Sequence, residues 1–137
     1  MSAQLQPAVD ADSGEFWSAL KRGELRLQYG RTANRWQFPP LEVCRHTGER
    51  LEWRIVGTGG SIFSYIIQHS PVADGFEALL PYVIALVELD DAPGVRLPLR
   101  IEGSNGDGVV IGDRVRVEIM AMPNSEIDIA VGRLEHV

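Results

Sequence analysis

The chain has 137 residues, the size of a single domain, and 45% of them are apolar, which is enough to build a hydrophobic core. Its net charge of −6 opposes the phosphate neutralisation on which nucleic-acid binding depends, and it also opposes binding to anionic membranes. The single cysteine excludes an internal disulfide framework and is typical of a reducing compartment. Because the sequence also lacks a signal-peptide pattern and a run of about 18 apolar residues, we expect a cytoplasmic protein without a membrane span.

The first predicted element is a short helix that follows a leader of residues 1–11. Asp12 is the expected N-cap, and Glu15, three residues later, would complete a capping box. The helix is expected from Ser13 to about Arg22, and Gly23 would end it. Apolar side chains cover so much of its surface that it must dock on another part of the protein.

The remainder of the chain has the pattern of short β-strands. Leu25 and Leu27 alternate with polar residues, which predicts a first strand. Six further runs, each rich in β-branched or apolar residues, are bounded by Gly, Pro, Asn or Asp. They are Leu51–Val56, Ser61–Gln68, Tyr82–Leu89, Val95–Ile101, Arg114–Met120 and Ile127–Leu134. Five or six strands after one helix indicate a small closed barrel, of which the OB-fold is the common five-stranded form.

The segment from Gly75 to Leu89 admits a second interpretation. Its apolar residues also lie near helical spacing, and a long helix here would indicate a hot-dog fold with acyl-CoA thioesterase or hydratase chemistry. Pro81 would lie inside that helix and would cost about 3 kcal/mol. We therefore expect a loop up to Leu80 and a strand after Pro81.

Residues 29–48 have the layout of a zinc ribbon without its ligands. A four-cysteine zinc site takes two thiolates from each of two tight turns, or knuckles. The first knuckle is residues 30–33 and the second is residues 44–47, so the four ligand positions hold Gly30, Ala33, Cys44 and Thr47. A single thiolate cannot hold structural zinc, so we expect no metal and no cofactor. Packing, or contact with a partner, must organise this loop instead.

Several short segments match a known family in their order and spacing over roughly residues 14–120. They are Phe16-Trp17, Gly23–Gln28, Phe38-Pro39-Pro40, Cys44, Gly48, Gly59–Tyr65, Gly75–Glu77, Pro81–Asp90 and Ile111–Val117. In these features the chain resembles the DUF35 proteins, which carry an N-terminal helix, a rubredoxin-like zinc ribbon and an OB-fold. The resemblance implies a partner of thiolases and related acyl-CoA enzymes, including hydratase and aldolase subunits. The catalytic residues would then belong to the partner.

Three groups of residues could carry chemistry in this chain, and each has a simpler interpretation. His69, Asp74 and Glu77 could form an acid–base cluster, but no nucleophile motif accompanies them and they more simply belong to a solvated loop. Cys44 and His46 need not meet, and Cys44 is expected to be a buried small hydrophobe. The glycines of 57–60 and 103–108 are expected to form turns, because no P-loop Lys accompanies them.

Aromatic residues and arginines gather in the N-terminal part of the chain. These aromatic residues have two interpretations: they form a small core between the helix, the ribbon and the barrel, or some of them are exposed and anchor a partner protein, since Trp and Tyr dominate interface hot spots. The residues expected at this interface are Phe16, Trp17, Leu20, Tyr29, Trp36 and Phe38. The neighbouring Arg31, Arg35 and Arg45 could contact a phosphate of acyl-CoA or an acidic patch of a partner.

The sequence therefore predicts a mainly β protein in three parts. Residues 1–23 form the leader and helix, residues 24–50 form a degenerate rubredoxin-like ribbon, and residues 51–137 form a five-stranded OB-fold barrel. The predicted function is a non-catalytic accessory subunit of a thiolase-like, aldolase or hydratase complex that processes acyl-CoA. Association of the chain with copies of itself is a further possibility. The alternatives are a stand-alone acyl-CoA hydratase or thioesterase, and an OB-fold that binds single-stranded nucleic acid.

Overall fold

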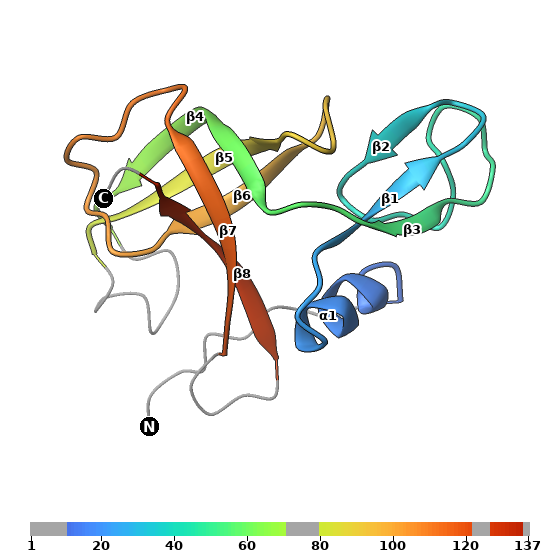
Figure 1. Cartoon of the computed structure of the whole chain (residues 1–137), viewed down its shortest axis with the longest axis horizontal. Helices are drawn as coiled ribbons and strands as arrows, with labels where there is room; N and C mark the ends of the chain where they lie inside the picture. The colour runs from blue at the N-terminus through green and yellow to red at the C-terminus, as the bar shows by residue number, and fades with distance from the viewer. Residues whose placement is uncertain (1–10, 71–79, 122–126, 136–137) are drawn as a thin grey trace.

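The computed structural model describes residues 11–70, 80–121 and 127–135. A three-stranded antiparallel sheet lies beside a closed five-stranded barrel, and a short helix packs below them (Figure 1). The elements are α1 (Gly14–Lys21), β1 (Arg26–Gly30), β2 (Arg35–Gln37), β3 (Glu52–Ile55), β4 (Gly59–Gln68), β5 (Tyr82–Leu89), β6 (Arg96–Ile101), β7 (Arg114–Ala121) and β8 (Asp128–Leu134). The predicted fold class, mainly β with an N-terminal helix, a ribbon and an OB-type barrel, is confirmed.

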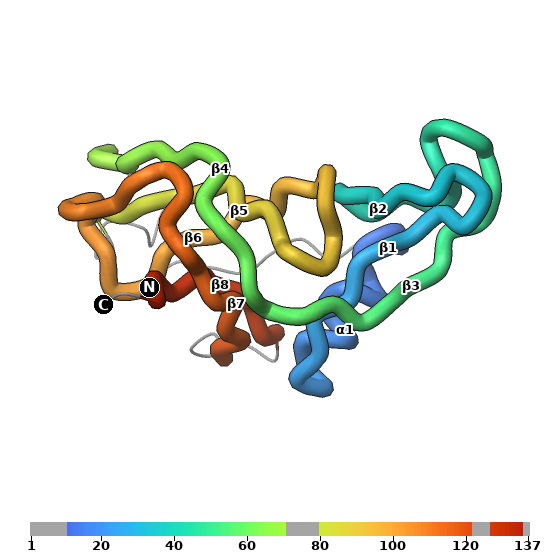
Figure 2. The backbone as a smooth tube through the Cα atoms, turned by 45° about the horizontal axis from the view of Figure 1, so that its top comes forward, coloured from blue at the N-terminus to red at the C-terminus, as the bar shows by residue number. Residues whose placement is uncertain are grey.

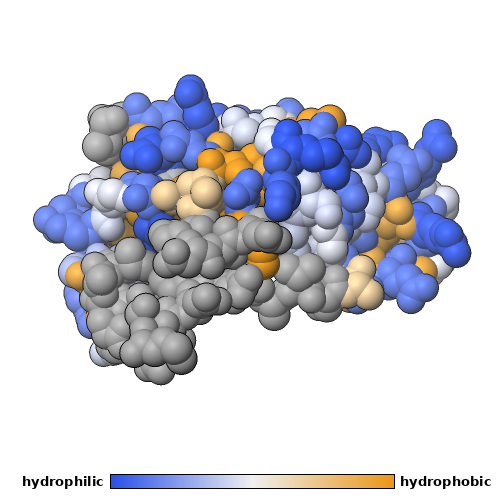
Figure 3. All heavy atoms as spheres, turned by 90° about the horizontal axis from the view of Figure 1, so that it is seen from below, coloured by the Kyte–Doolittle hydropathy of each residue, from blue (hydrophilic) through white to orange (hydrophobic). Residues whose placement is uncertain are grey.

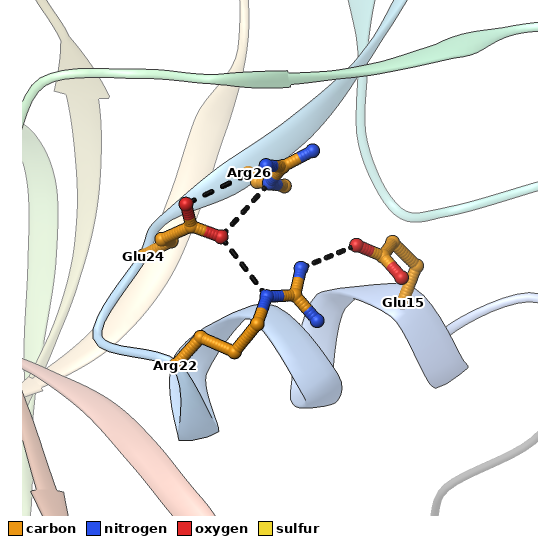
Figure 4. Close-up of polar contacts among 4 residues, drawn as sticks. All are labelled: Glu15, Arg22, Glu24 and Arg26. Atoms are coloured by element: carbon orange, nitrogen blue, oxygen red, sulfur yellow. Dashed lines mark hydrogen bonds and ion pairs between the residues drawn. The ribbon is translucent and has the colours of Figure 1, made fainter.

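Helix α1 and its N-cap each lie one residue later in the chain than predicted. The N-cap is Ser13, whose side chain makes no capping hydrogen bond, so the capping box expected from Asp12 and Glu15 was wrong. Glu15 instead accepts a hydrogen bond from Arg22 at 2.7 Å, where the helix ends. Arg22 also donates to Glu24, which in turn pairs with Arg26 on β1 (Figure 4). This chain of ion pairs fixes the exit of the helix against the first strand.

The N-terminal sheet has the strand order β2-β1-β3. Tyr29 of β1 lies opposite Trp36 of β2 and Glu52 of β3, which places the three residues on one face of the sheet. The strand predicted over Leu51–Val56 therefore forms, as β3, but it pairs with β1 and not with the barrel. The connection from β3 to β4 is the segment that joins this sheet to the barrel (Figure 2).

The barrel closes in the order β4-β5-β6-β8-β7. Alternate residues of its strands point inward, so that Val83, Ala85 and Val87 of β5 are fully buried. The parallel pairing of Ile101 on β6 with Gly132 on β8 completes the ring. A Cβ atom at Gly132 would lie 2.8 Å from Ile101 Cδ1 and 2.9 Å from Val115 Cγ1, so this position requires glycine. The barrel interior is therefore filled by side chains and not open.

The segment from Tyr82 to Leu89 is a strand, as expected, because it pairs along its length with both β4 and β6. A long helix reaching Leu89, and with it the hot-dog fold, is excluded. The part of that segment at 71–79 lies outside the described residues.

Helix α1 joins the same hydrophobic core as the barrel. Phe16 and Leu20 pack with Leu25, Leu27 and barrel residues, and the helix contacts both β1 and β8. With eight residues, α1 is far shorter than the about 20 residues that cross a bilayer, and no membrane-spanning helix occurs among the described residues.

Candidate functional site: a ribbon without metal ligands and the cleft beside it

The two knuckles of the ribbon still face each other. A Cβ atom at Gly30, the first ligand position, would lie 3.4 Å from Cys44 Sγ, which is the third. The second knuckle is closed by a hydrogen bond from Gly48 N to the Cys44 carbonyl at 2.8 Å, and Cys44 N donates to the Glu49 carbonyl at 2.8 Å. Among the described residues, no group of three or more His, Cys, Asp or Glu side chains could hold a metal ion. The two turns therefore meet, as the knuckles of a metal ribbon do, but the described residues between them offer no set of metal ligands.

The side chain of Glu49 bridges the knuckles. Its carboxylate accepts hydrogen bonds from Thr32 N at 3.0 and 3.1 Å and from Ala33 N at 3.2 Å. The Thr32 hydroxyl, followed by the amides of Ala33 and Thr32 and the Thr47 hydroxyl, holds the pKa of Glu49 below its ordinary value. Oε1 also lies only 2.9 Å from the position of a Cβ at Gly30. Glycine at the first ligand position therefore makes room for the carboxylate.

Two buried glutamines hold the loop that leads into the second knuckle. Gln28 donates to the Leu41 carbonyl at 2.6 Å and accepts from Leu41 N at 2.9 Å. Gln37 donates to the Val43 carbonyl at 3.2 Å and accepts from Arg45 N at 3.0 Å. These side chains are only 4% and 5% exposed, and the hydrogen bonds to the backbone offset the cost of burying their amide groups.

Cys44 lies inside the ribbon and does not pair with the His46 ring. Its side chain is 3% exposed, and its Sγ accepts from the backbone N–H of His46 at 3.4 Å. The Thr47 hydroxyl, followed by this N–H, lowers the pKa of the thiol, while the charge of Glu49 acts in the opposite direction. The His46 ring turns to Arg35, whose Nη1 donates to Nε2 at 3.3 Å. The structure therefore brings no thiolate–imidazole pair together here.

A cleft of about 320 Å³ separates the ribbon from the barrel. One wall is formed by β2 and Phe38 together with Arg45 and His46 of the second knuckle, and the other wall is the β5–β6 turn at Pro93, Gly94 and Val95. Figure 2 shows this turn reaching beside β2. We call this space the ribbon–barrel cleft.

The three arginines predicted to meet a phosphate lie in two different environments. Arg31 is exposed and pairs with Glu52 at 3.3 Å. Arg35 and Arg45 line the ribbon–barrel cleft and pair with no carboxylate in the described part of the chain. Only two of the three predicted residues are therefore brought together.

The predicted interface residues divide by burial. Phe16 and Leu20 are 7% and 1% exposed and belong to the core, so their placement on a partner surface was wrong: a side chain packed inside the chain cannot reach another protein. The half-buried ones are Trp17, Tyr29, Trp36 and Phe38. The aromatic rings form two clusters. In the first, the buried Phe16 contacts Trp17 and Phe38 at ring-centroid distances of 5.2 and 6.1 Å. In the second, Tyr29 contacts Trp36 at 4.9 Å.

The remaining candidate cluster is only partly described. His69 is exposed after the end of β4, whereas Asp74 and Glu77 lie outside the described residues.

On the face of the molecule seen from below, apolar residues gather near the middle while the ribbon end is mostly hydrophilic (Figure 3).

Sequence analysis missed four features of this site. Glu49, Gln28 and Gln37 were not singled out, because a polar residue in a short strand or turn has no local sign that it will be buried. The β5–β6 turn was missed as a wall of the cleft, since it lies some 50 residues after the second knuckle along the chain.

Comparison with known proteins places this geometry in a family. A family model described as "ChsH2, C-terminal OB-fold domain" matches residues 53–119. The chain is 30% identical over 122 residues to the 3-oxo-4,17-pregnadiene-20-carboxyl-CoA hydratase alpha subunit of Mycobacterium tuberculosis, covering 89% of this chain and 38% of that protein. It is 36% identical over 74 residues to a DUF35 domain-containing scaffold protein of Methanothermobacter thermautotrophicus, covering 54% and 53%.

A solved structure described as "Ltp2-ChsH2(DUF35) aldolase" superposes with a TM-score of 0.80 and 29% sequence identity, covering 94% of this chain and 98% of that one. The chain thus spans about a third to a half of the length of the curated relatives it matches, but nearly all of the solved DUF35 chain. The order of helix, ribbon and barrel, the match over the barrel and the likeness in structure lead to one conclusion: the chain belongs to the DUF35 family of OB-fold proteins.

Proposed function

We propose that this chain is a non-catalytic accessory subunit of an acyl-CoA-processing enzyme in the cytoplasm. The observation that carries the proposal is the likeness, over nearly the whole of both chains, to the DUF35 chain of an aldolase structure. Relatives named as alpha subunits of acyl-CoA hydratases, and as scaffold proteins, support the same role. The partner would be a thiolase-like, aldolase or hydratase subunit, which would supply the catalytic residues. This chain would stabilise the partner or help to form its acyl-CoA site.

The half-buried aromatic residues of the helix and ribbon are the proposed contact surface. Trp17, Tyr29, Trp36 and Phe38 each combine a fixed ring with remaining exposure, as anchor residues at protein interfaces do. Tyr29 also contacts Arg54, whose Cζ lies 4.0 Å from the centroid of the tyrosine ring. Rings that are already ordered lose little conformational entropy on binding, which favours them as anchors.

The experiment is to purify the tagged chain from its native host at its endogenous level and to identify the co-eluting protein by mass spectrometry. Binding of that protein is then measured for Trp17→Ala and Trp36→Ala, after circular dichroism has shown that both variants fold. Truncating a central aromatic anchor costs about 2 kcal/mol, or roughly a thirtyfold loss of affinity. Phe63→Ala is the matched control, because Phe63 is an aromatic residue on the barrel that is 48% exposed.

We expect an acyl-CoA enzyme to co-elute with the chain. The two tryptophan variants should bind this enzyme more weakly than the wild type does, whereas Phe63→Ala should bind it as tightly. Equal binding by all variants would remove the interface assignment. Turnover of acyl-CoA by the isolated chain would instead show that the chain is an enzyme, and the accessory role would be wrong.

A further inference from the structure

We propose that Asn105 is a site of spontaneous covalent modification, at which the side-chain amide is converted through a cyclic imide to aspartate and isoaspartate. Asn105 is exposed and lies in the loop between β6 and β7 (Figure 1), where Gly106 follows it. In this reaction the backbone nitrogen of the next residue attacks the side-chain amide, and glycine obstructs the attack least because it has no side chain. The reaction needs neither a partner protein nor a cofactor.

The fold requires glycine at the position after Asn105. The φ angle of Gly106 is +107°, in the left-handed region that other residues rarely adopt. A Cβ atom here would also lie 2.5 Å from Ile67 Cδ1 and 2.8 Å from Ile67 Cγ1, so the isoleucine at the end of β4 would have to move. A bulkier residue at this position would protect the asparagine, but it would strain the loop. The reactive Asn-Gly pair therefore follows from the way the loop packs against β4.

The side chain of Asn105 is folded back onto the residues that follow it. Its Oδ1 accepts a hydrogen bond from the backbone N–H of Asp107 at 2.9 Å. This bond polarises the amide carbonyl, which favours attack on its carbon, Cγ, and it holds Cγ over the following peptide bond. The N–H of Gly106 donates to Ser104 Oγ at 3.2 Å, so the attacking nitrogen is bound to a hydroxyl and not to a neighbouring strand.

The reaction balances with water as the only co-reactant. The Gly106 nitrogen forms a bond to Asn105 Cγ, the bond from Cγ to the amide nitrogen breaks, and the proton from the Gly106 N–H leaves with the ammonia. Ser104 Oγ accepts that N–H, and it can pass the proton to the leaving amine. Water then opens the cyclic imide at either of its carbonyl groups, which gives aspartate or isoaspartate.

The products would loosen the contact between the loop and β4. Isoaspartate adds a methylene group to the main chain beside Ile67, and either product places a new carboxylate close to Asp107. Further along the loop, Gly112 N donates to the Ile62 carbonyl at 2.8 Å, and Ile62 N donates to the Asp113 carbonyl at 2.9 Å. These bonds fasten the loop to the strand, so we expect the modification to weaken them.

The test uses the purified full chain, incubated in mildly alkaline buffer because the attacking nitrogen must lose its proton. Peptide mapping by mass spectrometry follows the change of amide to carboxyl group, and a protein isoaspartyl methyltransferase detects the isoaspartate. Asp107 also precedes a glycine, but its isomerisation would leave the mass unchanged. Asn34 is the internal control, because it is exposed as well but precedes Arg35, which is paired within the ribbon sheet. Peptide mapping also separates Asn124, which lies outside the described residues.

We expect Asn105 to be converted while Asn34 keeps its amide. Ser104→Ala should slow the conversion by a factor of about three to ten, since positioned acid–base groups contribute about 10²-fold or more in enzymes and a single exposed hydroxyl contributes less. Ser70→Ala, at an exposed serine after β4, is the matched control and should leave the rate unchanged. In the converted chain, the amide hydrogens of Ile62 and Gly112 should exchange faster than in the fresh protein.

Two results would overturn the proposal. The first is conversion of Asn105 that is no faster than that of Asn34. The second is conversion in the folded chain that is slower by about tenfold or more than in the chain unfolded in urea, because the turn would then protect the asparagine instead of positioning it for attack. An unchanged rate in Ser104→Ala would remove the role of the hydroxyl, and unchanged exchange at Ile62 and Gly112 would remove the effect on the barrel.

Discussion

Glu49 and Thr32 join the two knuckles of the ribbon: the carboxylate accepts the Thr32 backbone N–H at 3.0 Å through Oε1 and at 3.1 Å through Oε2. A zinc ion in a ribbon is coordinated by thiolates, whereas a carboxylate accepts hydrogen bonds from N–H and O–H donors. Where the two knuckles of this ribbon meet, a carboxylate held by hydrogen-bond donors stands in the place that a metal ion takes in a zinc ribbon.

We predict that Glu49→Gln weakens the ribbon more at neutral pH than in acid. The donors around Glu49 lower the pKa of its carboxyl group, so the charged form contributes stability above the ordinary carboxyl pKa, and that contribution is lost as the pH falls through the lowered value. Urea denaturation at about pH 7 should show a lower stability for the variant than for the wild type, and the difference should be smaller at about pH 3, below the ordinary carboxyl pKa of about 4.3. Glu42→Gln, an exposed neighbour, is the control. A difference that is the same at both pH values would contradict the prediction.

Zinc should bind when its ligands are restored. The wild type is predicted to contain no stoichiometric zinc, because only Cys44 of the four ligand positions is a cysteine. A variant with Gly30→Cys, Ala33→Cys and Thr47→Cys, combined with Glu49→Ala to clear the centre, should bind about one zinc per chain with tetrahedral thiolate ligands. Elemental analysis and cobalt absorption spectra measure this. If the variant folds and binds no metal, the four positions do not converge as the contact between Gly30 and Cys44 indicates.

The substitution Gln28→Leu should destabilise the protein by about 1–3 kcal/mol, because it keeps the volume of the side chain and leaves the N–H and carbonyl of Leu41 without their partner. Denaturation in urea measures the change. The control is Gln68→Leu, at a glutamine of β4 whose amide bonds the carbonyl of Ser70 at the surface. An equal effect of the two substitutions would show that the buried amide of Gln28 has no special role.

A second pH-dependent contribution is predicted at the rim of the barrel. Arg114 lowers the pKa of Asp90 by hydrogen bonding to it, at 3.0 and 2.5 Å, across Gly59 of β4. The folded-state pKa is lowered, so the pair contributes stability at neutral pH and loses it in acid. Asp90→Asn should thus lower the melting temperature at about pH 7 and have a smaller effect at about pH 3, below the ordinary aspartate pKa of about 3.9, while Asp107→Asn, at an exposed loop carboxylate, should change neither. Because the pair is exposed, high salt should also reduce its effect.

The barrel could be predicted from the sequence, but the centre of the ribbon could not. Pro81 and the β-branched run after it identify β5, because proline and side-chain branching act locally on the backbone. The pairing of β3 with β1, and not with the barrel, depends on register between segments about 25 residues apart, which no local pattern encodes. The burial of Phe16 and Leu20 likewise depends on what the helix packs against, and from the sequence an anchor for a partner and a core residue look the same.

Helix α1 rests on β8 as well as on β1, so the earliest helix of the chain completes its packing on the last described strand. During synthesis the helix leaves the ribosome long before β8 does. Phe16 and Leu20 then have only part of their final surroundings, and the ring of strands stays open because Gly132 has not yet met Ile101. The core that α1 shares with the barrel therefore cannot be complete before β8 has been synthesised. Until the C-terminal strand emerges, the nascent chain exposes apolar surface that a chaperone, or a waiting partner subunit, can bind.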